Sequence, residues 1–265
     1  MIKPRLIAIT IIRNEEKNFL DEWLDNIGHI ADYHIFLDDA SDDNTPQRIR
    51  EHLRTFPGEL HQRSTSIFRE NEPALRSELW EYARAQARPG DWILIVDADE
   101  FYDGHMLRLK QKLLGNECKN IEVVKVSCLD LWNASGYRTD GHWSPRKSDV
   151  RVIKYHNVPF GAYGTALHMP PYPASTDVAK NYSVYVPKIH FAYLRKSDRV
   201  RRYEFYTKNV SASENSISYK HALSINDKKV SVKKYFTFLR TIFAALNSDT
   251  LYFKIKKAAK KYEEI

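Results

Sequence analysis

The chain contains the sequence Trp92-Ile93-Leu94-Ile95-Val96-Asp97-Ala98-Asp99-Glu100-Phe101, an apolar run followed directly by acidic side chains. Such a run is typical of a buried strand. Asp97 and Asp99 are two residues apart, so they would project from the same side of the strand end. Burying either carboxylate unpaired is unfavourable, whereas Mg²⁺ or Mn²⁺ takes oxygen ligands of this kind. The sequence therefore predicts a metal site, with a solvated acidic turn as the alternative.

Strands and helices are predicted to alternate before this site. Asn14 is placed to cap a helix with Glu15 and Glu16 in its first turn, and Thr45 is placed to cap another. Alternation of this kind predicts a parallel α/β sheet, whose ligands lie beyond the carboxyl ends of the strands. The expected elements are a strand over Leu6–Ile12, a helix over Glu15–Gly28, a strand over His34–Leu37, a helix over Thr45–Arg54, a strand over Ser64–Phe68, a helix over Pro73–Arg88 and a strand over Trp92–Val96.

The pattern changes after residue 105. Shorter strands are expected over Ile121–Cys128, Val150–Lys154 and Tyr182–His190, and the chain reads as helical and basic from Ser197 onward. No linker of distinct composition separates these parts. We therefore expect one domain over residues 1–195 and a helical extension over residues 196–265 packed on it.

The composition is that of an ordinary globular protein, with 43% hydrophobic residues, 9 Gly and 11 Pro among 265 residues. No apolar run reaches the roughly 18 residues of a membrane-spanning helix, and the short run after the basic N-terminus predicts a strand instead of a signal peptide. Cys118 and Cys128 are too few for a disulfide scaffold and lack metal-site spacing, which favours a reducing, cytoplasmic location. The net charge of +7 suits phosphate-bearing substrates, anionic membranes or nucleic acid.

A second acidic loop, Asp38-Asp39-Ala40-Ser41-Asp42-Asp43-Asn44-Thr45, also follows an apolar strand. Its carboxylates could accept hydrogen bonds from a nucleotide base and ribose. The alternative is a loop whose polar side chains only cap the next helix.

These segments together resemble family 2 glycosyltransferases of the GT-A fold. The resemblance rests on Ile7–Glu16, on Phe19–Trp23, on the second acidic loop and on Trp92–Phe101, in that order along residues 5–105. The Asn14-Glu15-Glu16 sequence and the Glu22-Trp23 pair are closest to one subgroup of that family. The resemblance implies a Rossmann-like mixed sheet flanked by helices and a metal-dependent, inverting sugar transfer from a nucleoside-diphosphate sugar. Residues 1–105 would bind the donor and residues 106–195 the acceptor.

Particular residues acquire roles by this resemblance. Asp99 would bind the metal, Asp97 would contact metal or ribose, and His190 in Lys188–Arg195 would close the metal site, since imidazole is a Mn²⁺ ligand. The residues expected to contact the nucleotide sugar are Thr10, Asn14, Asp39, Ser41, Arg76, Asp97 and Arg195, with Asp39 near the base and Arg195 on the diphosphate. His168 is expected on the acceptor side. The alternative for Arg76 is an arginine exposed on a helix without a binding role, and the alternative for His190 is a histidine packed in the core.

The catalytic base is not supplied by the resemblance, because the family's usual Glu-Asp pair is missing at the expected distance. Asp149 is the preferred candidate, and Asp130 and Asp140 are the other two. Each of the three could instead be an ordinary surface or turn residue. An aromatic group could stack on an acceptor sugar, with core packing as the alternative. Its members are Trp132, Tyr137, Trp143, Phe160 and Tyr163.

The basic, amphipathic segment Tyr252–Tyr262 could rest on an anionic membrane carrying a lipid-linked acceptor, or be a solvated terminal helix. The predicted function is sugar transfer in glycan or surface-polysaccharide assembly. A nucleotidyltransferase is disfavoured because Arg13–Glu16 stands where a Gly-rich phosphate loop would be. A glycosyltransferase-like domain that binds without catalysis remains an alternative. A basic nucleic-acid-binding protein is another, although the acidic loops repel phosphate and no nucleic-acid partner is expected.

Overall fold

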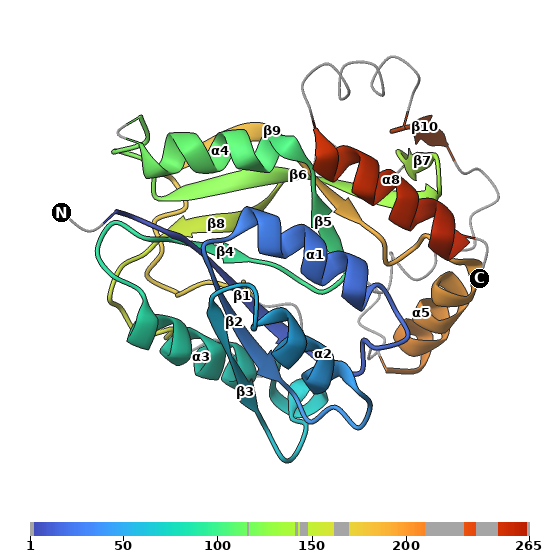
Figure 1. Ribbon diagram of the computed structural model, residues 1–265, viewed down its shortest axis with the longest axis horizontal. Helices are drawn as coiled ribbons and strands as arrows, with labels where there is room; N and C mark the ends of the chain where they lie inside the picture. The colour runs from blue at the N-terminus through green and yellow to red at the C-terminus, as the bar shows by residue number, and fades with distance from the viewer. Residues whose placement is uncertain are drawn as a thin grey trace.

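A computed structural model describes residues 3–115, 117–140, 143, 148–161, 170–209, 231–236 and 249–263, with backbone only at 183–184 and 205–209. Its described strands form one mixed sheet in the order β10-β7-β6-β8-β4-β1-β2-β3, and β9 joins β6 to β5 (Figure 1). The strands are β1 (Leu6–Ile12), β2 (Tyr33–Asp38), β3 (Gly58–Gln62), β4 (Trp92–Ile95), β5 (Glu100–Tyr102), β6 (Val123–Asn133), β7 (Gly136–Arg138), β8 (Ser148–Lys154), β9 (Asn181–His190) and β10 (Val232–Lys234).

The first half of the sheet is parallel, because β4, β1, β2 and β3 all run the same way. Alternate residues of β1 face opposite layers of helices. Leu6 and Ala8 belong to the core shared with α1, α4 and α8, while Ile7 and Ile9 pack with α3 on the other face (Figure 1). The helices are α1 (Leu20–Ile30), α2 (Thr45–His52), α3 (Phe68–Gln86), α4 (Gly104–Leu114), α5 (Lys196–Asn209) and α8 (Thr250–Glu263). The predicted fold class, a mixed α/β sheet flanked by helices, is confirmed.

The predicted helix caps at Asn14 and Thr45 are wrong. Asn14 has a positive φ of 54°, and α1 begins only at Leu20. α2 begins at Thr45 with Asn44 before it, and the Thr45 hydroxyl accepts hydrogen bonds from the backbone N–H groups of Glu15 and Glu16 instead. Both polar side chains therefore connect the loop after β1 to the loop after β2.

The predicted strand over Ser64–Phe68 is also wrong. The third parallel strand is β3, Gly58–Gln62, which pairs with β2 from His34 to Asp38. As the edge strand β3 is only partly buried, its sequence lacks the continuous apolar run of an interior strand.

α3 starts earlier than its predicted Pro73 and contains a kink. Asn71 is non-helical (φ −157°, ψ 73°), and its side-chain oxygen accepts a hydrogen bond from the backbone N–H of Ala74. Asn71 thus caps the longer part of the helix, and Pro73 falls in the first turn, where its missing N–H is not needed. The kink separates the turn at Phe68–Glu70 from the rest of α3.

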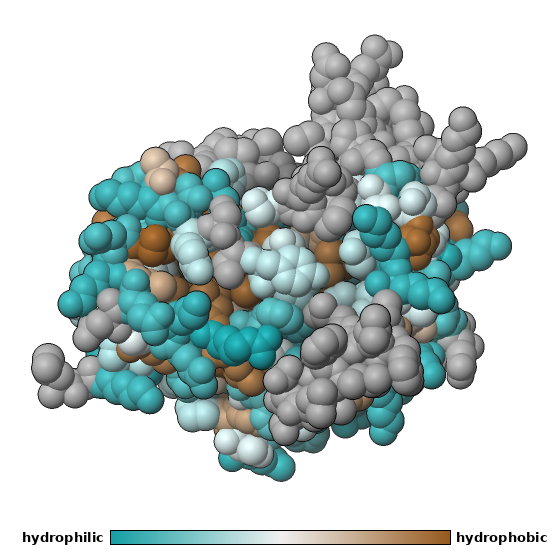
Figure 2. Space-filling view, turned by 90° about the horizontal axis from the view of Figure 1, so that it is seen from above, coloured by the Kyte–Doolittle hydropathy of each residue, from teal (hydrophilic) through white to brown (hydrophobic). Residues whose placement is uncertain are grey.

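The C-terminal segment completes the core. β10 pairs with β7, so the predicted helical extension also contains a strand. α8 buries Leu251, Tyr252, Ile255, Ala258, Ala259 and Tyr262 against the layer formed by α1 and α4. Because its apolar side faces this core, that side is not available to a membrane. Seen from above α4 and α8, hydrophilic residues cover most of the described surface (Figure 2). Among the described residues, no helix has the length and hydropathy to span a bilayer.

Two histidines are packed between α1, α2 and β2. The rings of His34 and His52 meet edge to face at 5.2 Å, and His52 stacks on Phe56 at 4.6 Å. Nε2 of His52 has no hydrogen-bond partner among the described residues. Burial, with the neighbouring His34, lowers the pKa of His52 to about 4, and burial also lowers the pKa of His34.

This pair predicts a loss of stability in acid. As the pH falls from 6.5 to 4, the unfolded chain binds a proton at His52 before the folded chain does, so the free energy of unfolding falls. The contribution of His52 is about 2 kcal/mol. Urea titrations at pH 7 and pH 4.5 measure how far the free energy of unfolding falls between the two pH values. This fall should be about 2 kcal/mol smaller in His52→Phe than in the wild type. A control at exposed His156, His156→Gln, should behave as the wild type, and an equal loss in all three proteins would contradict the prediction.

Candidate metal and nucleotide site

Asp97 and Asp99 lie in the turn between β4 and β5. The backbone N–H of Glu100 closes this turn by donating to the Asp97 carbonyl at 3.0 Å, and the N–H of Val96 donates to Ile9 of β1 at 3.2 Å. The two acids therefore stand beyond the carboxyl end of β4, beside the parallel strand β1. This is the position at which α/β sheets bind ligands.

Asp97 has the more exposed side chain of the two, at 42%. Nη2 of Arg151 lies 3.4 Å from its Oδ2. Burial opposes its ionisation, but Arg151 and then Arg76 outweigh that effect and hold the pKa of Asp97 below its ordinary value. Asp97 is thus an ionised carboxylate with one side open, and Arg76 of α3, which pairs with Glu72, is close enough to act on it.

Asp99 is flanked by two basic side chains. Its Oδ2 lies 3.4 Å from Nε2 of His190 and 3.0 Å from Nη2 of Arg202 on α5. Burial would raise the pKa of Asp99, but His190 and Arg202 hold it well below the ordinary value. The pairing of β5 with β9 places Glu100 opposite His190, which explains how a residue so distant in sequence reaches Asp99.

Asp130 orients His190. Its Oδ1 lies 2.6 Å from Nδ1 of His190, and β6 places Asp130 directly beside His190 of β9. The imidazole therefore lies between two carboxylates, Asp130 at Nδ1 and Asp99 at Nε2. Burial opposes its protonation, but Asp99 and Asp130 raise the pKa of His190 well above the ordinary value. Asp130 was predicted as a candidate base, whereas the structure commits its carboxylate to His190.

Behind the acidic turn, a buried cluster of charges joins β5, β8 and β9. Nζ of Lys188 lies 2.8 Å from Oε1 of Glu100 and 2.9 Å from Oδ2 of Asp149, while Arg151 contacts the same Glu100 oxygen at 2.6 Å. Glu100 and Lys188 are 1% and 3% exposed. Burial opposes the charge on Lys188, but the surrounding acidic groups, Glu100 and Asp149 among them, hold its pKa well above the ordinary value.

Asp149, the preferred candidate base, belongs to this cluster. Its side chain is 47% exposed and paired with Lys188. Although burial favours the neutral acid, Lys188 holds the pKa of Asp149 below its ordinary value. Asp140 pairs instead with Arg138 at 2.6 Å, away from the acidic turn.

The predicted nucleotide-binding loops are bonded to each other. The backbone N–H of Asn14 donates to the Ser41 hydroxyl at 2.9 Å, and the Asn14 side-chain oxygen accepts from the N–H of Asp42 at 2.9 Å. Ser41 also contacts the carboxylate of Asp38. Asn14 and Ser41 are therefore close together, and these hydrogen bonds join the two turns at which Asn14 and Ala40 have a positive φ.

Asp39 is buried and holds the start of α3. Its carboxylate accepts hydrogen bonds from the Ser66 hydroxyl at 2.5 Å and from the backbone N–H groups of Ile67 and Phe68 at 3.0 and 3.2 Å. It is 1% exposed. A direct contact with a nucleotide base would require these bonds to open, so the structure gives Asp39 a role in shaping the loop instead. Thr10, also 1% exposed, lies within β1.

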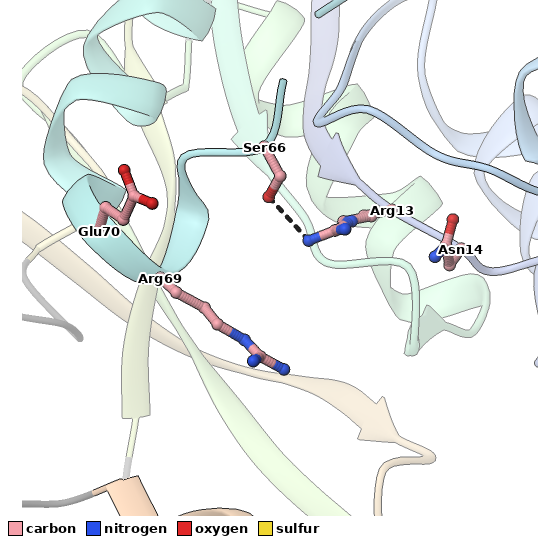
Figure 3. A pocket seen from close by; sticks show the side chains of 5 residues that line it. All are labelled: Arg13, Asn14, Ser66, Arg69 and Glu70. Carbon is pink, nitrogen blue, oxygen red and sulfur yellow. Dashed lines mark hydrogen bonds between the residues drawn. The ribbon is translucent and has the colours of Figure 1, made fainter. Parts of the chain in front are cut away.

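A cleft of about 500 Å³ lies between the end of β1 and the first turn of α3. It is lined by Arg13, Asn14, Ser66, Arg69 and Glu70. Arg13 donates to the Ser66 hydroxyl at 2.7 Å, and Figure 3 shows Arg13 and Arg69 extending towards each other from opposite sides. Two guanidinium groups in a cleft suit an anionic or planar ligand.

Glu15 connects this cleft with the acidic turn. It follows Asn14 in the chain, and burial together with the nearby Asp99 carboxylate raises the pKa of Glu15 to about 7. The side chain of Asn18 donates to it at 2.8 Å. Since β1 and β4 are adjacent parallel strands, the cleft and the acidic turn lie at neighbouring strand ends.

Arg195 does not lie where it was predicted. It bonds Asp198 and the side-chain oxygen of Asn18, and its guanidinium lies 4.8 Å from the ring centre of Phe19. These contacts fix the start of α5 to the loop before α1. Arg202, seven positions later and inside α5, is the arginine that reaches Asp99.

The predicted aromatic wall is also wrong in part. Trp143 is 1% exposed and packs edge to face on Tyr193, with ring centres 4.3 Å apart, while Arg138 lies over it at 4.9 Å. Phe160 is buried in the core on the α3 face. Both rings are buried, so neither is exposed to stack on a sugar. His168 and Tyr163 lie outside the described residues.

Sequence reasoning missed five charged residues of the site, namely Glu15, Glu100, Arg151, Lys188 and Arg202. One signal was present in the sequence. Lys188 and His190 are two residues apart in an otherwise apolar strand, so both project to one face, and a charge on a buried strand needs a partner.

No family model matches the chain, and no curated protein sequence matches it. Among solved structures, TarS of S. aureus superimposes with a TM-score of 0.49 and 13% identity over 83% of this chain and 42% of that one. Residues 1–349 of TarS in complex with UDP superimpose with a TM-score of 0.38 and 17% identity, over 48% of this chain and 36% of that one. Glucosyl-3-phosphoglycerate synthase of Mycobacterium tuberculosis, in complex with Mn²⁺ and UDP-glucose, superimposes with a TM-score of 0.33 and 19% identity. The match covers 47% of this chain and 44% of that one. The chain spans less than half the length of each solved chain.

Proposed function

We propose that this chain transfers a sugar from a nucleoside-diphosphate donor to an acceptor hydroxyl, with a divalent cation, in glycan or surface-polysaccharide assembly. The observation that carries the proposal is the arrangement around Asp99. An ionised carboxylate pair at the end of a parallel strand lies beside an imidazole, an arginine and an arginine-lined cleft. The order of motifs that resembles family 2 glycosyltransferases supports the same function.

The donor atoms suit Mn²⁺ or Mg²⁺. Asp97 and Asp99 offer carboxylate oxygens, both held ionised, and His190 presents Nε2 to Asp99. Oxygen ligands suit both cations, and imidazole favours Mn²⁺. When bound there, the cation would neutralise charge on the departing diphosphate. TarS with UDP and the synthase with Mn²⁺ and UDP-glucose are consistent with such ligands.

The surrounding residues have distinct tasks in this proposal. Arg13 and Arg69 line the cleft for the nucleotide, while Asn14 and Ser41 fix its loops. Arg202 would hold the diphosphate in place of Arg195, because it is the arginine beside the metal-binding carboxylate. Asp149 remains our candidate base for an inverting transfer, since it is half exposed and kept ionised by Lys188.

A second candidate is a domain that binds the donor without transferring the sugar. One observation favours it, namely that Asp130, Asp140 and Asp149 are each already paired with a basic side chain. A paired carboxylate is a weaker proton acceptor than a free one. Hydrolysis or transfer of the donor would exclude this candidate.

A ligand panel tests the donor site. Melting curves are recorded with UDP, GDP, CDP and TDP, each with Mn²⁺ and with EDTA. A diphosphate at about 100 times its dissociation constant should add about 2.7 kcal/mol to the free energy of unfolding. We expect one base to be preferred and the shift to require Mn²⁺. No Mn²⁺-dependent shift with any of the four would overturn the proposed function.

Arg195, just before α5, and Arg202, within it, should behave differently. Arg202→Gln should weaken diphosphate binding about 10- to 100-fold, because a charge-assisted hydrogen bond contributes about 1.5–3 kcal/mol. Arg195→Gln should leave the affinity unchanged and lower the melting temperature, because Arg195 joins α5 to the loop before α1. Isothermal titration and thermal melting separate the two effects. Similar affinities for both variants would show that Arg202 does not contact the diphosphate.

A further inference from the structure

Cys128, Asp130 and His190 form a compact cluster on β6 and β9. Cys128 and Asp130 are two apart on β6, so they share one face, and the strand pairing puts His190 beside Asp130. One ligand atom from each residue lies within 4.8 Å of the other two. Sγ of Cys128 is 3.9 Å from Oδ2 of Asp130, and Oδ1 of Asp130 is 2.6 Å from Nδ1 of His190.

The cluster is partly buried, with Asp130 and His190 only 14% and 18% exposed. Its three ligands suit a different cation from the acidic turn. A thiolate, an imidazole and a carboxylate are the usual zinc ligands, whereas Mg²⁺ prefers oxygen alone. Three protein ligands also leave a fourth tetrahedral position open to water.

We propose that Cys128, Asp130 and His190 bind a zinc ion at a site separate from Asp97 and Asp99. Binding forms bonds from zinc to Sγ of Cys128, Nδ1 of His190 and a carboxylate oxygen of Asp130. The thiol proton and the Nδ1 proton, which the Asp130 hydrogen bond holds in this structure, pass to solvent.

Because His190 is shared, zinc at this site would inhibit cation binding at the acidic turn, a consequence that rests on the proposed function. With Nδ1–H donated to Asp130, the Nε2 atom facing Asp99 can serve as a ligand. With zinc on Nδ1, the remaining proton sits on Nε2 and is donated to Asp99. The ring therefore serves either the zinc ion or the cation at the acidic turn, but not both.

Isothermal titration with zinc chloride on the full chain tests the site. Wild type and Cys118→Ser should each bind one equivalent, and Cys128→Ser should bind at least tenfold more weakly. Cys118→Ser is the matched control, because Cys118 is the other cysteine of the chain and is not in the cluster. Titration with Co²⁺ should give a near-ultraviolet thiolate-to-cobalt band in wild type and Cys118→Ser but not in Cys128→Ser. Equal zinc affinity in all three proteins would overturn the site.

A second measurement needs no variant. Alkylation of Cys128 by iodoacetamide, followed by mass spectrometry with Cys118 as internal reference, should slow at least tenfold with zinc and stay unchanged with Mg²⁺. An unchanged rate with zinc would overturn the proposal even if Cys128→Ser failed to fold.

Asp99→Ala separates this proposal from the proposed function. This variant should lose Mn²⁺-dependent diphosphate binding and still bind one zinc ion, at a lower affinity because the zinc-bound His190 no longer has the Asp99 carboxylate as acceptor at Nε2. Zinc affinity lost in Asp99→Ala but kept in Cys128→Ser would place the ion at the acidic turn and refute the site. If no diphosphate binds wild type, the proposed function and the inhibition fail, and the zinc titration still decides the site.

Discussion

Lys188→Met is expected to lower the free energy of unfolding by about 3 kcal/mol. The substitution removes a buried cation from between Glu100 and Asp149, and breaking a buried ion pair from one side leaves a charge without compensation. Arg151 still contacts Glu100, which places the loss at the lower end of the range for such changes. Urea denaturation followed by circular dichroism measures it.

Two further variants show whether the loss comes from the unpaired charge. Asp149→Asn combined with Lys188→Met should recover part of the lost stability, because it removes the carboxylate that has lost its ion-pair partner while Glu100 keeps its pair with Arg151. Lys180→Met removes an exposed lysine that pairs with Asp177 and should change stability by less than about 0.5 kcal/mol. A Lys188→Met protein within about 1 kcal/mol of the wild type would show that the buried cluster does not depend on this lysine.

Asp99→Asn is expected to lower the turnover of the nucleotide-sugar donor by about 10³-fold. The substitution keeps the size of the side chain but removes the charge that would hold the cation, and lost electrostatic stabilisation of a transition state has effects of this order. The assay measures release of nucleoside diphosphate in saturating Mn²⁺, with the donor base found by the ligand panel.

Asp177→Asn is the matched control, since Asp177 is an exposed aspartate that pairs only with Lys180 among the described residues. It should keep the wild-type rate. Asp177→Asn should melt near the wild-type temperature, whereas Asp99→Asn loses the pairing with His190 and Arg202 and should melt lower, so the rates are compared at a temperature at which both variants are folded. More than a tenth of the wild-type turnover in Asp99→Asn would contradict a metal role for this residue.

The sequence predicts the strands of the parallel half well, because interior strands are continuous apolar runs. β1 is predicted over its full length, and β4 is predicted to within one residue. The edge strand β3 was missed because a half-buried strand such as Gly58–Gln62 carries no such run. The cap at Asn14 failed for another reason, since an Asn that follows a strand suits both a helix cap and a left-handed turn.

For the site, the sequence predicts only what lies close together in the chain. Asp97 and Asp99 are recognisable from one short segment. Asp130 and His190 are 60 residues apart, and only the pairing of β6 with β9 shows that they touch. Arg195 lies just before α5 and Arg202 lies within it, and only the structure shows which of the two reaches Asp99. The sequence did not indicate Cys128 as a metal ligand, because its partner His190 lies on another strand and the three residues form no recognisable metal-binding motif.

The packing of α8 on α1 has a consequence for synthesis on the ribosome. Phe19 and Tyr262 lie with ring centres 4.8 Å apart, and the hydroxyl of Tyr262 donates to Glu22. The layer that begins with the first helix is therefore closed by a residue 240 positions later in the chain than Glu22. Since such distant contacts form slowly, the nascent chain would expose the apolar side of α1 until α8 has been translated, and a chaperone that shields it should raise the yield of folded protein.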